Sequence, residues 1–131
     1  MNSALAEYGR LIGRDDLASG HHGQACRMVW PDGSSVDIEE IEGELQVSLA
    51  FAAAHPNGSE LLKALQLLDL RQAGAAAPLQ VGLVGLGVDA RLVVLARSVA
   101  READGRLIQQ HVERCRQWQR RWEAMCQRQA T

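Results

Sequence analysis

The fold depends most on one stretch of the chain, residues 59–72, which reads SELLKALQLLDLRQ. At 100° per residue its leucines fall on different faces of a helix. One face carries Leu61, Leu65 and Leu68, whereas other directions are taken by Leu62, Leu67 and Leu70. Such a helix needs two packing partners, and 131 residues leave room for one covering layer. We therefore expect a homodimer paired through this helix. The alternative is a monomer that sandwiches the helix between its own elements.

Length and composition predict one globular domain spanning residues 1–131, with 47% hydrophobic residues. No apolar run approaches the roughly 18 residues of a membrane span. The N-terminus has neither the basic start nor the apolar segment of a signal peptide. We therefore expect a cytoplasmic protein without membrane insertion. The three cysteines, Cys26, Cys115 and Cys126, are widely spaced and contain no C-x-x-C pair, so we expect reduced thiols.

Charge is distributed unevenly along the chain. Residues 1–69 carry four basic and eleven acidic side chains, whereas residues 101–131 carry seven basic and four acidic ones. Phosphate contacts require clustered Lys and Arg, and Lys63 is the single lysine, so nucleic acid is not an expected partner. The arginines of the last helix are expected to form a solvated face, with binding of an acidic partner as the alternative: Arg114, Arg116, Arg120 and Arg121.

The front half predicts a helix followed by a three-stranded meander. Residues 3–13 place apolar side chains on one helical stripe. Strict alternation over residues 25–30 predicts a strand, and Pro31-Asp32-Gly33 supplies a turn into the next one. The alternation slips at Glu39-Glu40, which leaves open a bulge or an early strand end. Residues 45–51 then alternate without fault.

The back half predicts a second hairpin and the longest helix. The hairpin strands cover residues 79–86 and 91–97. Residues 104–126 gather their apolar side chains on one stripe, with Asp104 as N-cap. The predicted fold class is α+β, in the order α-β-β-β-α-β-β-α, with an antiparallel sheet flanked by helices.

No catalytic residue, metal site or cofactor is expected. His111 and Cys115 stand one helical turn apart, but they lie in the Trp-rich apolar stripe without a second ligand pair. Gly82, Gly85 and Gly87 follow the order GxxGxG and precede a hairpin, whereas a phosphate loop precedes a helix. The strands offer mainly apolar side chains, which favours holding polypeptide over catalysis.

Several short motifs occur in a characteristic order. The first helix reads Leu5-x-x-Tyr8-x-x-Leu11-Ile12, and a meander with a D-G turn leads to the leucine-rich residues 59–68. Residues 86–95 read LGVDARLVVL, similar to an "LGLD…GRLVL" stretch, and Trp122 lies near the C-terminus. Together these features resemble the class I type III secretion chaperones, the family of the Tir chaperone, nearly from end to end.

The resemblance implies a cytoplasmic bacterial homodimer that binds the N-terminal chaperone-binding segment of a secreted effector without ATP. The segment would lie extended, add a strand at a sheet edge and place apolar side chains beside a first helix whose stripe is only partly covered. The residues expected to form the effector-binding groove are Leu5, Tyr8, Ile12, Met28, Trp30, Val36 and Ile38. Those expected at the dimer interface are Leu62, Gln66, Leu67 and Leu70.

Two other functions stay open at this stage. A protein of the same fold can sequester a transcriptional regulator or its antagonist and release it when effector leaves. A small enzyme with a ligand pocket between the sheet and the last helix is the second alternative.

Overall fold

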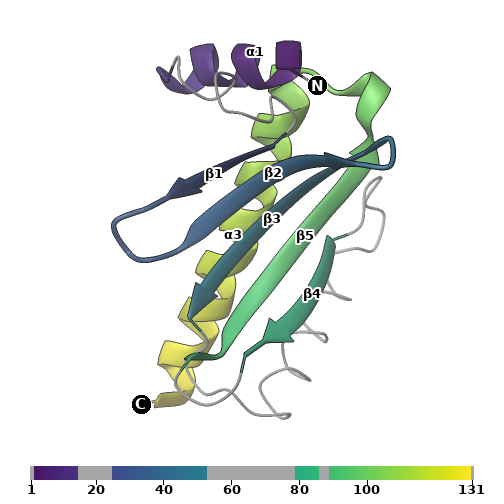
Figure 1. Cartoon of the computed structure of the whole chain (residues 1–131). Helices are drawn as coiled ribbons and strands as arrows, with labels where there is room; N and C mark the ends of the chain where they lie inside the picture. The colour runs from purple at the N-terminus through teal and green to yellow at the C-terminus, as the bar shows by residue number, and fades with distance from the viewer. Residues whose placement is uncertain (1, 15–24, 53–78, 86–88, 131) are drawn as a thin grey trace.

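A computed structural model describes residues 2–14, 25–52, 79–85 and 89–130; the rest is a thin grey trace in Figure 1. The described elements are α1 (Asn2–Ile12), β1 (Ala25–Val29), β2 (Ser35–Ile41), β3 (Glu44–Ala52), β4 (Leu79–Val84), β5 (Arg91–Val99), the short 3-10 helix η2 (Ala100–Glu102) and α3 (Gly105–Ala130). These confirm the two predicted hairpin regions and the first and last helices. The helix predicted at residues 59–72, with the dimer face assigned to it, lies outside the described residues.

The five strands form one sheet in the order β1-β2-β3-β5-β4, and every neighbouring pair is antiparallel. The α+β class with an antiparallel sheet is therefore confirmed. Although β3 and β4 follow each other among the described strands, β5 lies between them (Figure 1). The two edges of this sheet are β1 and β4.

The β2–β3 connection settles the question left by the slipped alternation. Strand β2 pairs with β3 without interruption from Ser35 to Ile41, and Ile41 lies opposite Glu44. Glu42 and Gly43 both have positive φ, 51° and 79°, which matches a two-residue hairpin turn. Neither the bulge nor the early end occurs. The strand continues regularly and leaves Ile41 41% exposed on the polar side.

One face of the sheet, here called the inner face, packs against α3, which lies behind the strands in Figure 1. Helix α1 packs on α3 near one end of the sheet. Within the core the rings of Trp118 and Trp122 stack with centroids 6.0 Å apart, and Phe51 of β3 lies 6.2 Å from Trp118. The apolar stripe predicted for the last helix is thus the side that covers the sheet.

The start of α3 is capped as the sequence predicts. Asp104 Oδ1 accepts a hydrogen bond of 2.8 Å from the backbone N–H of Leu107, the residue three positions after it. This bond satisfies one of the N–H groups that the first helical turn leaves without a partner.

Candidate peptide-binding surface

The structure buries most of the residues predicted to line the groove. Leu5, Tyr8, Met28, Val36 and Ile38 are each no more than 4% exposed and belong to the chain's own core. The expectation that the stripe of the first helix is only partly covered is therefore wrong at Leu5 and Tyr8. The reason is that α1 turns this stripe toward α3, and the same burial raises the pKa of Tyr8 to about 12.

Two of the seven predicted groove residues keep accessible surface. Ile12 is 37% exposed at the end of α1, next to Leu11 at 46%. Trp30 is half-buried and packs against the core at the end of the first strand. A partner role for Ile12 and Trp30 stays a prediction, and Leu11 joins them as an exposed apolar side chain.

Strand β1 forms an edge whose outward backbone groups follow from the hairpin geometry. Trp30 N donates to Ser34 O at 2.9 Å, so Trp30 and Ser34 form a hydrogen-bonded pair. Such pairs alternate along an antiparallel ladder, which assigns Met28 and Cys26 to the bonds with β2. The N–H and C=O groups of Ala25, Arg27 and Val29 therefore point away from β2, toward the edge of the sheet that no other described strand pairs with.

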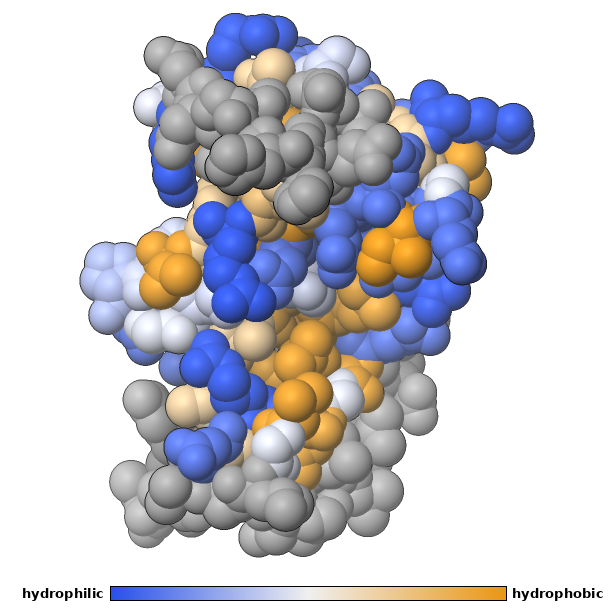
Figure 2. All heavy atoms as spheres, in the orientation of Figure 1, coloured by the Kyte–Doolittle hydropathy of each residue, from blue (hydrophilic) through white to orange (hydrophobic). Residues whose placement is uncertain are grey.

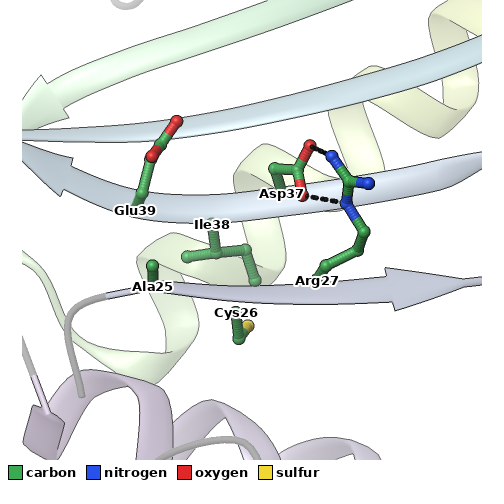
Figure 3. Close-up of a pocket in the computed structure, with 6 residues that line it drawn as sticks. All are labelled: Ala25, Cys26, Arg27, Asp37, Ile38 and Glu39. Atoms are coloured by element: carbon green, nitrogen blue, oxygen red, sulfur yellow. Dashed lines mark hydrogen bonds and ion pairs between the residues drawn. The ribbon is translucent and has the colours of Figure 1, made fainter. Parts of the chain in front are cut away.

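The two sides of this edge differ in chemistry (Figure 3). On the outer face of the sheet, which is turned away from α3, Arg27 forms a bidentate pair with Asp37, at 2.7 Å from Nε and 3.0 Å from Nη2. On the inner side, the Cys26 side chain points toward α1. These residues line a depression of about 370 Å³. An added strand would meet polar groups on one side and apolar groups on the other.

The turn that ends this edge is held to α3 by one arginine. Arg116 lies over the Trp30 ring, with Cζ 4.6 Å from the ring centroid. Its Nη1 donates to Ser34 Oγ at 2.9 Å and lies 3.6 Å from Asp32 Oδ2. Hydrogen bonds from Ser34 hold the pKa of Asp32 below its usual value. The prediction of a solvated face is therefore wrong at Arg116. The contact between Arg116 and Trp30 could not be predicted from helical periodicity.

A hydroxyl–imidazole pair lies in the core. Ser98 Oγ and His111 Nε2 are 3.1 Å apart, and Nδ1 has no hydrogen-bond partner among the described residues. Burial lowers the pKa of His111. Because His111 is only 2% exposed, a substrate could reach the imidazole only if the core opened. In the described ranges, no three His, Cys, Asp or Glu side chains are placed to hold a metal ion.

Neither of the two α-helices that the structure describes combines the length and the apolar character needed to cross a membrane.

The chain was compared with known proteins at the level of sequence and of structure. No family model and no curated protein matched the sequence. Among solved structures, the chain is similar to one chain of the heterodimeric complex ExoU–SpcU from the type III secretion system of Pseudomonas aeruginosa. The sequence identity is 17% and the TM-score 0.47, over 90% of this chain and 87% of that chain.

Proposed function

We propose that this chain is a cytoplasmic type III secretion chaperone. It binds the extended N-terminal chaperone-binding segment of an effector and keeps that segment soluble and secretion-competent without ATP. The observation that carries the proposal is the outer edge of β1, which no other described strand pairs with and which has outward backbone groups at Ala25, Arg27 and Val29. The family resemblance in the sequence agrees with it.

An edge strand of this kind suits an unfolded partner. A segment that pairs with β1 satisfies its own backbone N–H and C=O groups, whatever its sequence, while alternate side chains select it. The inner side offers half-buried Cys26 and Trp30, with exposed Leu11 and Ile12 at the end of α1. The buried residues Leu5 and Met28 support this surface from beneath.

The dimer is part of the proposal. We assign its interface to residues 59–72, with Leu62, Gln66, Leu67 and Leu70 as contacts, because leaving these leucines in water would forfeit roughly 1.5–3 kcal/mol for each buried side chain. Light scattering after size exclusion should report twice the chain mass. Leu62→Asp should weaken the dimer, and a monomer at micromolar concentration for the unmodified chain would contradict this assignment.

The edge is tested with two variants at one position. Val29→Pro removes an outward N–H without touching the bonds between β1 and β2, whereas Val29→Ala removes only side-chain atoms. The probes are N-terminal fragments of the proteins encoded by the neighbouring genes, each co-expressed and captured with this chain. Val29→Pro should lower the affinity at least tenfold with little change in melting temperature. Val29→Ala keeps the outward N–H and gives up only the side-chain contact, so it should lose clearly less affinity than Val29→Pro.

Two results would contradict the proposal. Undiminished capture by Val29→Pro would show that the edge of β1 takes no part in binding. Failure of the unmodified chain to hold any exported protein would reject the chaperone function itself. A stable partner that is a non-exported regulator would instead support the sequestering function.

A further inference from the structure

An uncharged row of residues crosses all five strands on the outer face of the sheet. The register aligns Val29, Ser35, Ala50, Val93 and Gly82, one from each strand. With neighbouring strands about 4.8 Å apart, this outer row is roughly 19 Å long, which matches about six extended residues. Figure 2 looks onto this face and shows hydrophobic residues gathered over β4 and β5.

The outer row is hollowed and its walls are accessible. A depression of about 460 Å³ is lined by four residues of the row together with Val84 and Arg91; the four are Val29, Ser35, Ala50 and Val93. Val29 is 69% exposed and Val84 58% exposed, the two most exposed large apolar side chains of the described residues. Neither described α-helix lies over this face in Figure 1. A partner could therefore bury both valines without displacing either α1 or α3.

The charges beside the outer row are not balanced. Arg27 is compensated by its bidentate pair with Asp37. Arg91 Nη2 donates to Gly33 O and to Ala50 O, both at 3.0 Å, and these acceptors are neutral. Among the described residues no carboxylate lies within ion-pair distance of Arg91. Within the described part of the chain, the depression thus keeps one positive charge without a carboxylate partner. Its guanidinium is held in place, and its Nε and Nη1 groups form no hydrogen bond with another described residue.

We propose that the outer row and Arg91 bind a second stretch of the client polypeptide: an extended, aliphatic segment with one acidic side chain seated against Arg91. This inference rests on the proposed function and names the chemistry of a further part of the same client. A carboxylate forms short charge-assisted bonds with a guanidinium. Because two carbonyls already hold this guanidinium, little side-chain entropy is lost when the carboxylate binds.

The shape of the site favours polypeptide over a small anion or a second copy. An anion bound at Arg91 would leave Val29, Val84 and Val93 in water. The outer row bears no acidic group that would meet Arg91 of another copy across a two-fold axis. An extended segment covers the valines. Val29 belongs both to the β1 edge and to the outer row, so one client chain can pass from that edge to the outer face.

The test compares two peptides that differ in charge alone. The probes are nine-residue fluorescein-labelled peptides of alternating Val and Thr, with Glu at the centre of one and Gln in the other. The full-length chain should bind the Glu peptide at least tenfold more tightly at low salt. Amide shifts of the ¹⁵N-labelled protein should change at Ser48, Ala50 and Val93 when the Glu peptide is added.

The matched variants are Arg91→Gln and Arg97→Gln. Both residues lie on the outer face of β5, but Arg97 is already paired with Glu44. Arg91→Gln should abolish the preference for Glu, whereas Arg97→Gln should leave it unchanged. Arg91→Lys keeps the charge without the planar fork and should retain part of the preference, which provides a second variant if Arg91→Gln folds poorly.

Several outcomes overturn the inference. If the unmodified chain binds the Glu and Gln peptides with equal affinity, Arg91 has no role in selecting an acidic side chain. If Arg97→Gln lowers the preference for Glu as much as Arg91→Gln does, the preference reflects unspecific charge attraction. Self-association that is lost in Arg91→Gln assigns the face to a second copy. Client capture without a preference for Glu rejects the inference but leaves the chaperone function. A preference for Glu without client capture rejects the chaperone function but leaves the acidic-peptide site.

Discussion

Gly105, the first residue of α3, lies directly against the backbone of Tyr8 in α1. A β-carbon built at position 105 would stand 2.7 Å from the Tyr8 amide nitrogen and 2.8 Å from the Glu7 carbonyl carbon. Both are backbone atoms, so neither can move aside by changing a rotamer. The absence of a side chain at residue 105 is what lets the two helices approach this closely.

Gly105→Ala should therefore displace α1. Alanine normally favours a helix over glycine, so a loss of stability here would report the contact with α1. We expect the free energy of unfolding in urea to fall by about 1–3 kcal/mol. Gly82→Ala is the control, because no heavy atom lies within 4 Å of its built β-carbon. Equal stability of Gly105→Ala and the unmodified chain would mean that α1 is not docked in this way.

Leu5→Asp and Ile12→Asp should separate folding from binding within α1. Leu5 is fully buried, so an unpaired carboxylate there should cost roughly 3 kcal/mol or more. Ile12 is 37% exposed, so its variant should melt within a few degrees of the parent and lose at least tenfold in client affinity, about 1.4 kcal/mol. Thermal melting and client titration check the pair. Normal client binding by Ile12→Asp would place the binding surface elsewhere.

The stability of the chain should fall in mild acid because of His111. Burial and, to a lesser degree, the charge of Arg114 lower the pKa of His111 in the folded state. The unfolded chain then binds more protons than the folded chain below about pH 6.5, the ordinary histidine value. The contribution of neutral His111 is present above that pH and is lost as the pH falls through its folded-state pKa.

Urea unfolding at a series of pH values checks this assignment. The difference in unfolding free energy between the unmodified chain and His111→Gln should be constant above pH 7 and should change below pH 6.5. The other three histidines are common to both proteins, so they cancel in the difference. A difference that does not depend on pH would show that His111 has the same pKa in the folded and the unfolded chain, as expected for an imidazole accessible to solvent.

Cys115 should be the slowest of the three thiols to react. It is fully buried, its Sγ lies 3.8 Å from the carbonyl oxygen of Val94, and burial raises its pKa to about 12. Cys26 and Cys126 are half-buried, and no disulfide bond involves any of the three. Labelling with a disulfide reagent, followed by mass spectrometry, should modify Cys115 only in denaturant. Fast labelling of Cys115 under native conditions would contradict the packing of α3.

Periodicity determined the kind and order of the described elements because it depends only on neighbouring residues. Alternation over residues 45–51 predicts β3 whatever lies on either side of it, and Asp104 caps α3 through a contact three residues away. For the same reason the sequence predicted an antiparallel sheet, since short turns join the strands within each hairpin.

Only the tertiary structure decided what covers each apolar face. The stripe of α1 looks the same in the sequence whether it meets α3 or a partner, and the close approach at Gly105 is what turns Leu5 and Tyr8 into core. Likewise Arg116 and Arg120 both read as surface arginines, but the position of the β1–β2 turn places Trp30 and Ser34 against Arg116. A local pattern tells which residues share a face. The path of the whole chain determines what that face meets, because the contacting residues are far apart in the sequence.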